Sequence, residues 1–385
     1  MKSTSIGKIA DVQTGPFGSQ LHKEDYITNG TPIVTVEHLG QKTFTTQNLP
    51  CVSAKDKVRL TKYTMRSGDI IFSRVGSVDR CSFATGNNDG WLFSGRCLRL
   101  RVTDINVNSE YLYYYFCQEA VKELIRNHAV GATMPSLNTK LLSELPFAYP
   151  EIEQQTRIVS LLSNIDAKIE RNAHINQNLE QQAQAIFKSW FVDFEPFQDG
   201  KFVDSECGPV PEGWQVGTLK EMLDIRYGKD HKKLSEGKIP VYGSGGLMRL
   251  VDKALYSGES VLIPRKGTLN NVMRVTGDFW TVDTMFYSVP KRKGAAKFAF
   301  HILHNMDLAS MNSGSAVPSM TTDILNSIVI VVPPQSVLDS FDETTKALWE
   351  LHESNLHESR RLATLRDTLL PKLMSGEIDV SEVEI

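Results

Sequence analysis

Two short segments each place a basic side chain close to a glycine, and these basic side chains are the first candidates for a functional role. SGDIIFSRVGS (67–77) resembles SGESVLIPRKGT (257–268), and each has an arginine two residues before a glycine, Arg74 and Arg265. Guanidinium groups can hydrogen-bond to the edges of nucleic acid bases. Alternatively, they pair with surface carboxylates while the glycines only serve tight turns. The segments alone leave both interpretations open.

Motifs for catalysis are absent from the sequence. It contains no G-x-x-x-x-G-K-[ST] phosphate loop and no H-E-x-x-H zinc motif. G-x-S-x-G is missing because Tyr242 precedes Ser244, and Ser313 precedes Ser315, where the first glycine must be. No spacing provides a base and an acid for a hydrolase built on Ser244. The Asn-Pro-Pro-aromatic stretch of adenine methyltransferases is also missing, the nearest match being Val-Pro-Pro-Gln (332–335). We therefore expect no catalytic residues.

Composition narrows the class of protein further. The 385 residues are 41% hydrophobic and 23% charged, which is typical of a chain with two or three domains. No apolar run approaches the roughly 20 residues of a membrane helix. The first residues, MKSTSIGKIADV, lack the apolar core of a secretory signal, and the five cysteines never lie close together. These features predict a cytoplasmic protein with no metal site and no membrane contact.

An internal repeat organises the chain. A shift of 183 residues lays GATMPSLNTKLLSELPFAYP (131–150) over GSAVPSMTTDILNSIVIVVP (314–333), with six identities in twenty positions. The formal net charge of -3 hides the same alternation, because residues 1–150 and 196–333 carry +4 and +2, while 151–195 and 334–385 carry -3 and -6. The chain therefore contains two diverged copies of one unit.

Each copy ends in a long segment with a heptad pattern of apolar residues. Such a seam predicts a long helix that pairs with another helix, and the natural partner is the second seam in the same chain. Asn172 and Asn355 occupy matching places and could set the register of the pair, although chance asparagines on ordinary amphipathic helices are the alternative. The seam residues are Ile158, Leu162, Ile165, Ile169, Asn172, Leu179 and Ile186, followed by Leu348, Asn355, Leu362 and Leu369.

The segments before the two helices predict a mixed fold. Short β-rich runs such as Cys97 to Val102 lie between glycine-rich turns, and Ser109 to Ile125 has helical spacing. We therefore expect an α/β (α+β) protein with two duplicated domains and two long helices paired as an antiparallel coiled coil. The expected parts are domain one (1–150), a central long helix (151–192), a linker with domain two (193–333), and a C-terminal long helix with a tail (334–385).

Several motifs together resemble a known family. The long segment EQQTRIVSLLSNIDAKIERNAHINQNLEQQAQAIFKSWFVDFEPF (153–197) is similar to the central conserved region of type I restriction-modification DNA specificity subunits. PEGW (211–214), the YGSGG turn (242–246) and LLPKLMSGEIDV (369–380) also resemble that family. The resemblance covers essentially the whole chain, and the order of the motifs around a central helix makes it specific.

The resemblance implies a function and a set of partners. Each domain would be a target recognition domain that reads one half of a bipartite site in double-stranded DNA. Two methyltransferase subunits using S-adenosylmethionine, and restriction subunits using ATP and Mg, would carry out adenine methylation and cleavage, so no cofactor is expected in this chain. The paired helices would act as the spacer, since a helix over residues 151–191 spans about 60 Å. A coiled-coil scaffold or interaction protein without DNA specificity is the alternative.

Within that resemblance, polar residues of the glycine loops become the candidates for DNA contact. Arg and Lys suit guanine, and Asn and Gln suit adenine. The TMPS (133–136) and AVPS (316–319) segments could line the DNA face or only form the turn before the last strand. The candidates are Phe17, Ser19, Arg74, Ser77, Arg80, Thr133 and Ser136 in domain one, and Lys229, Tyr242, Ser244, Arg265, Lys266, Asn270 and Asn271 in domain two.

Overall fold

The structure is a computed structural model that describes residues 1–131, 134–311 and 319–382, without the side chains of Ser19 and Lys23. The chain forms two compact units. The first contains residues 1–172 and 356–385, and the second contains residues 173–355. Among the described residues, no helix is both long and apolar enough to cross a membrane.

The first unit is built on two four-stranded sheets. One has the order β2 (Ala10–Thr14), β9 (Cys97–Val102), β6 (Ile70–Ser73) and β7 (Cys81–Phe83), with all neighbours antiparallel. The other has the order β3 (Tyr26–Ile27), β5 (Cys51–Val52), β4 (Thr31–Val34) and β8 (Leu92–Phe93), where β4 and β8 are parallel. β1 (Lys2–Ser5) pairs with β10 (Pro146–Tyr149). All four residues of β6 are buried, so this strand runs through the interior of the unit.

Short helices complete the first unit. They are α1 (Ile6–Ile9), α2 (Ala54–Arg59), α3 (Ser109–Cys117), α4 (Glu119–His128) and α5 (Thr139–Glu144). The helix predicted from Ser109 to Ile125 is interrupted at Gln118, whose backbone is extended. Asn108 caps α3 by accepting hydrogen bonds from the backbone amides of Glu110 and Tyr111. The chain also contains 3-10 turns at η1 (Gly18–Gln20), η2 (Lys23–Asp25), η3 (Val36–His38), η4 (Thr61–Tyr63), η5 (Gly86–Asn88) and η6 (Glu195–Phe197).

The second unit repeats this plan. One sheet has the order β14 (Leu223–Tyr227), β21 (Met285–Pro290), β18 (Ser260–Pro264) and β19 (Met273–Val275), and the other has β16 (Gly246–Val251), β15 (Ile239–Gly243), β20 (Asp278–Thr281) and β17 (Tyr256–Ser257). β13 (Gln215–Thr218) pairs with β22 (Val329–Val332), and β11 (Phe202–Val203) with β12 (Val210–Pro211). The helices are α7 (Leu219–Met222), α8 (Ala295–Asn305) and α9 (Thr322–Asn326). The predicted duplication is confirmed, since β15 and β20 are parallel like β4 and β8.

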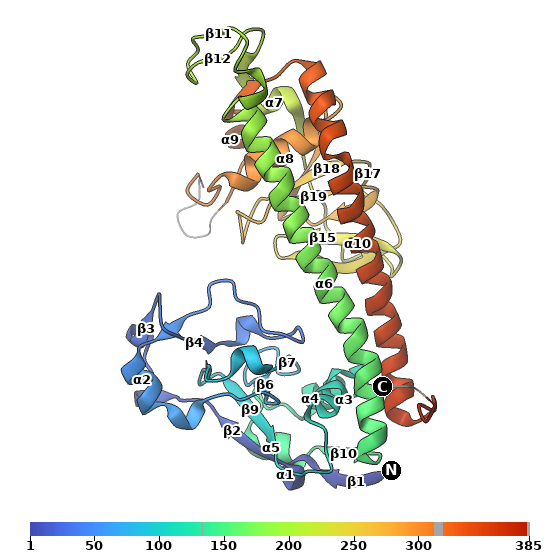
Figure 1. Cartoon of the computed structure of the whole chain (residues 1–385). Coiled ribbons are helices and arrows are strands. Elements are labelled where there is room, and N and C mark those ends of the chain that lie inside the picture. The colour runs from blue at the N-terminus through green and yellow to red at the C-terminus, as the bar shows by residue number, and fades with distance from the viewer. Residues whose placement is uncertain (132–133, 312–318, 383–385) are drawn as a thin grey trace. The chain divides into compact units, whose positions relative to one another are not determined.

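Two long helices, α6 (Ile152–Phe191) and α10 (Gln335–Ser375), pair inside each unit, where they lie side by side (Figure 1). In the first unit Arg366 contacts Asp166 at 2.8 Å, and Asn172 donates to Glu358 at 2.8 Å. In the second unit Asn355 donates to Asn176 at 2.9 Å. Residue numbers rise along one helix as they fall along the other, which confirms the predicted antiparallel pair.

Burial along the seam largely follows the predicted pattern. Asn172 is 1% exposed and Asn355 is 7% exposed, and both make side-chain hydrogen bonds to the opposite helix. Toward the second unit the buried positions shift by one residue, to Phe187 and Trp349, because an α-helix drifts relative to a heptad repeat. Ile158, Leu162, Asn172, Leu179 and Asn355 are buried, whereas Ile165, Ile169, Ile186, Leu348, Leu362 and Leu369 are partly buried.

The ends of the long helices complete the hydrophobic cores. The core of the first unit contains Leu370, Leu373 and Val380 from the C-terminal segment, packed with Ile158 and Leu162 of α6 and with the first domain. The second core contains Phe187 and Phe191 of α6 together with residues of α8 and α10. Residues close to the C-terminus therefore belong to the core of the N-terminal domain.

Candidate nucleic-acid interface

In the first unit, Arg74 lies immediately after strand β6, at the start of an exposed turn. Its guanidinium carbon is 5.6 Å from the ring centre of Phe17, and Nη1 donates a hydrogen bond of 3.3 Å to the Gly95 carbonyl. Phe17 is 59% exposed. Gly76 has φ +76°, a conformation that favours glycine, so the turn after Arg74 depends on this residue.

The second unit contains the corresponding arrangement after strand β18. The guanidinium carbon of Arg265 is 5.4 Å from the ring centre of Tyr227, and Nη1 donates to the Asp283 carbonyl at 3.2 Å. Tyr227 is 52% exposed, and Gly267 adopts φ +85°. Arg74 and Arg265 form no ion pair with a carboxylate among the described residues. Each guanidinium is therefore held by a ring and a carbonyl and keeps its charge unneutralised.

The serine that follows proline in each repeat docks on the arginine loop. Ser136 forms a β-bridge with Val75, and the Leu137 amide donates to the Arg74 carbonyl at 2.8 Å. In the second unit Ser319 bridges Lys266, and the Met320 amide donates to the Arg265 carbonyl at 2.9 Å. The two motifs recognised separately in the sequence thus form one site in each unit. Thr133 and residues 316–318 lie outside the described residues.

Further candidates gather around Arg265. The Asn271 side-chain amide donates to the Ser244 carbonyl at 2.8 Å, which joins the YGSGG turn to the arginine loop. A Cβ atom at Gly267 would lie 2.7 Å from Ser244 Oγ, so glycine permits this close approach. Lys229 is exposed, and its carbonyl accepts a hydrogen bond of 2.8 Å from the indole of Trp280. One surface of the second domain therefore carries Ser244, Arg265, Lys266 and Asn271, and Lys229 follows Tyr227 by two residues.

Three predicted residues have other surroundings. Arg80 donates to the Leu39 carbonyl and lies against Gly40, where a Cβ atom would be 2.6 Å from its Nε. The Asn270 side chain donates to Asp307 at 3.0 Å and accepts from the Ala309 amide at 2.9 Å. Tyr242 is only 8% exposed. Arg80 and Asn270 are nevertheless exposed, as is Ser77 beside Gly76, so contact of these three residues with DNA stays a prediction, whereas Tyr242 has little surface to offer.

Sequence reasoning missed Tyr227. The repeat aligns Gly15 with Gly228, so Tyr227 corresponds to Thr14, whereas Phe17 lies three residues further along the chain. The two units therefore place an exposed ring beneath the arginine from different sequence positions. A search for an aromatic residue within three positions of these aligned glycines would have found both.

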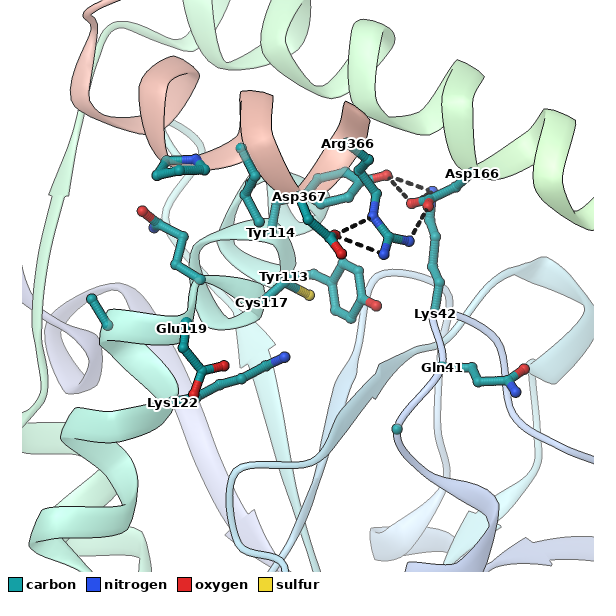
Figure 2. A pocket seen from close by; sticks show the side chains of 15 residues that line it. Gln41, Lys42, Tyr113, Tyr114, Cys117, Glu119, Lys122, Asp166, Arg366 and Asp367 are labelled. Atoms are coloured by element: carbon teal, nitrogen blue, oxygen red, sulfur yellow. Dashed lines mark hydrogen bonds and ion pairs between the residues drawn. The ribbon is translucent and has the colours of Figure 1, made fainter. Parts of the chain in front are cut away.

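A pocket of about 460 Å³ in the first unit contains a different kind of polar cluster (Figure 2). Arg366 and Tyr114 converge on Asp166, at 2.8 Å and 2.6 Å, and Lys42 contacts Glu110 at 2.6 Å. Burial, followed by the charge of Asp166, raises the pKa of Tyr114. Burial opposes the charge of Arg366, but the hydrogen bond and charge of Asp166 outweigh it and raise the pKa of Arg366. These groups form hydrogen bonds and ion pairs with one another, which indicates that the cluster connects helices α3, α6 and α10.

The described residues contain no group of three or more His, Cys, Asp or Glu side chains that could hold a metal ion. Their cysteines, Cys51, Cys81, Cys97, Cys117 and Cys207, are all free thiols. The arrangement that the two units share is a half-buried arginine that lies over an exposed aromatic ring at the edge of a glycine turn. Such a surface can bind an anionic, hydrogen-bonding and stacking partner, which is the chemistry of a nucleic acid.

Comparisons with known proteins agree with this chemistry. The family model for the type I restriction modification DNA specificity domain matches residues 1–181 and 211–349. The type I restriction enzyme MjaIX specificity subunit of Methanocaldococcus jannaschii is 28% identical over 305 residues, which cover 72% of this chain and 71% of the relative. The HindI specificity subunit of Haemophilus influenzae is 24% identical over 414 aligned positions, with 85% and 90% covered. The crystal structure of the S subunit from M. genitalium has the same fold, with a TM-score of 0.50, 19% identity, and coverage of 97% and 95%.

Proposed function

The chain belongs to the type I restriction modification DNA specificity family, and from this premise we propose that its two target recognition domains, within 1–150 and 193–333, each read one half of a bipartite duplex site. Like its relatives, the chain is a specificity subunit and not a catalytic one. The observation that supports the two-reader proposal is the paired arrangement of Arg74 on Phe17 and Arg265 on Tyr227.

The physical argument rests on how arginine recognises bases. Its planar guanidinium can donate two parallel hydrogen bonds to guanine O6 and N7, which distinguishes guanine from the other bases in the major groove. A ring beneath the guanidinium restricts its motion, so less conformational entropy is lost when it binds. Ser136 and Ser319 hold the two loops through backbone bridges. Divergence elsewhere in the domains would let the two halves of the site have different sequences.

Partner subunits complete the proposed activity. Two methyltransferase subunits that use S-adenosylmethionine would modify adenines, and restriction subunits that use ATP and Mg would cleave DNA. Support comes from the sequence, which contains neither a phosphate loop nor the Asn-Pro-Pro-aromatic stretch. A cytoplasmic location is part of the same proposal, since the DNA of a bacterial or archaeal cell lies there.

The experiment measures binding of the full chain to a duplex library randomised at both half-sites, at two salt concentrations. Arg74→Ala should relax preference in one half and Arg265→Ala in the other, each with a loss of about 1–3 kcal/mol at one base position. Arg226→Ala is the matched control, because Arg226 precedes Tyr227 on β14 and pairs with Asp224 at 2.8 Å.

Two results would contradict the proposal. If either arginine variant changed preference in both halves, the domains would not read independently. If the unmodified chain bound every sequence equally, the chain would not provide specificity on its own surface. A uniform loss across all sequences, with a salt slope lowered by about one unit, would assign that arginine to phosphate contact.

A further inference from the structure

An exposed apolar strand edge adjoins the arginine site in the second domain. Leu247, Met248 and Leu250 of β16 are 51%, 55% and 45% exposed. β16 is the outer strand of its sheet and is joined to β15 by the two-residue turn Ser244–Gly245. Through Ser244 this turn contacts Asn271 of the arginine loop at 2.8 Å. The apolar residues are therefore continuous with the surface assigned to DNA.

A lysine-rich segment (229–238) is fastened along the same strand. Arg249 of β16 donates hydrogen bonds of 2.8 Å to the carbonyls of His231 and Leu234. The segment contains four lysines against Asp230 and Glu236, and its residues Lys229, Lys232, Lys233 and Lys238 are all exposed. No ion pair of these lysines occurs in the described part of the chain. Apolar side chains flanked by a net positive charge fit a partner that carries negative charge on its outside and apolar groups within, as the major groove of DNA does.

The first domain has a different structure at this place. β4 and β5, which correspond to β15 and β16, are separated by residues 35–50, and η3 follows β4 directly. β5 is also paired on its outer side with β3, so its edge is covered. An open edge with a tight glycine turn is therefore specific to the second domain.

We propose that the β15–β16 hairpin enters the major groove of the second half-site and that Leu247 and Met248 contact thymine methyl groups there. The major groove admits a two-stranded β-ribbon, and apolar side chains distinguish thymine by its C5 methyl group. The lysines of segment 229–238 hold the ribbon by contacting phosphates on either side. This inference rests on the proposed function and adds a second kind of base contact to Arg265.

The test begins with the duplex that the full chain selects from the library randomised at both half-sites. Its thymines are replaced by deoxyuridine in one half at a time, which removes the methyl group and keeps base pairing. The unmodified chain should lose about fourfold in affinity for each contacted methyl group in the second half. The Leu247→Ala, Met248→Ala double variant should bind the thymine and deoxyuridine duplexes equally. Val329→Ala, at an exposed strand position of the same domain, should respond like the unmodified chain.

Each remaining outcome would overturn the inference. The inference is wrong if the selected second half-sites contain no thymine. It is also wrong if the unmodified chain binds the thymine and deoxyuridine duplexes equally, or if the double variant still distinguishes them. A double variant that changes only the oligomeric state, measured by sedimentation, would assign the edge to strand pairing between copies of the chain. If the unmodified chain binds all sequences of the library equally, this separate result would refute the proposed function itself.

Discussion

At the scale of single residues, the recognition surface depends on how a charged group is positioned. Arg74 and Arg265 occupy equivalent turns, yet their supporting rings, Phe17 and Tyr227, come from non-equivalent positions in the repeat. The pairing recurs although the ring position changed, which supports the proposal that each arginine needs a ring. It lies close enough to each guanidinium for a cation–π interaction.

The interaction between Tyr227 and Arg265 can be measured with a double-mutant cycle on affinity for the selected duplex. Arg265→Ala should abolish most of the effect of Tyr227→Leu, with a coupling of about 0.5–1 kcal/mol, because the ring acts through the guanidinium. Tyr227→Leu combined with Arg74→Ala is the control and should be additive, since these residues share no partner. Additivity in both cycles would show that the ring and Arg265 act separately.

His301 of α8, in the core of the second unit, is a second residue whose effect can be measured, because burial changes its pKa. It is 1% exposed, and its Nδ1 lies 2.7 Å from the Gln184 side-chain oxygen. Burial, followed by the nearby charges of His304, Arg274 and Lys297, lowers the pKa of His301 to about 3. The imidazole is therefore neutral in the folded chain.

Stability should consequently fall in mild acid. In the unfolded chain the imidazole takes up a proton below pH 6.5, whereas the folded chain resists protonation until about pH 3. Between pH 7.5 and pH 5 this difference should lower the free energy of unfolding by about 2 kcal/mol. Chemical denaturation of the chain and of His301→Gln at both pH values measures it, with His174→Gln, at an exposed histidine, as the control. An equal pH dependence in all three proteins would contradict this assignment.

At the scale of elements, Asp166 joins α6 to α10 and to the first domain. It accepts hydrogen bonds from Arg366 of α10 and Tyr114 of α3, and Lys42 of the loop before β5 lies 3.7 Å away. Its side chain is 9% exposed. One carboxylate therefore compensates groups from three segments. Without it Lys42 would keep Glu110 and Arg366 would keep Asp367, but the bonds that join α6 to these segments would be lost.

Asp166→Ala should lower the free energy of unfolding by about 3 kcal/mol. This is the lower end of the range for breaking a buried pair, because Arg366 retains 29% exposure. Glu153→Ala is the control: it removes an exposed pair with Arg157 on the same helix and should cost less than about 0.5 kcal/mol. Urea denaturation of the two variants compares them, and equal stability would show that the cluster does not hold the helices.

At the scale of the whole molecule, the C-terminal segment stabilises the N-terminal domain. Leu373 is 2% exposed and Val380 is 0% exposed, both within the core of the first unit. The Arg157 side chain of α6 also donates to the Ser381 carbonyl. The core of the first domain therefore includes residues more than 200 positions further along the chain.

Leu373→Ala should destabilise the first unit by about 2–5 kcal/mol, the usual cost of a cavity in a packed core. Leu365→Ala, on the same helix but 47% exposed, should change stability by less than about 0.5 kcal/mol. Hydrogen exchange provides the measurement, with faster exchange expected in β6 and β9. Faster exchange confined to strands of the second unit would show that the C-terminal segment supports the other domain.

Local and periodic features of the sequence were sufficient to predict the long helices and the duplication. The heptad pattern predicted both long helices, and the 183-residue shift predicted two similar domains, because helical period and repeated motifs do not depend on distant contacts. The order of the motifs along the chain also indicated the family to which it belongs. The arginine loops could be recognised since a glycine two residues after each arginine marks a turn that favours glycine.

Contacts between segments far apart in the chain could not be predicted from the sequence. The ring beneath Arg265, the docking of Ser136 and Ser319 on the loops, and the packing of Leu373 in the first core all join residues far apart in sequence. The partners of Arg80 and Asn270 and the burial of Tyr242 also became known only from the structure. The physical reason is that residue type determines which bonds a side chain can form, whereas packing determines which of these bonds remain available to DNA.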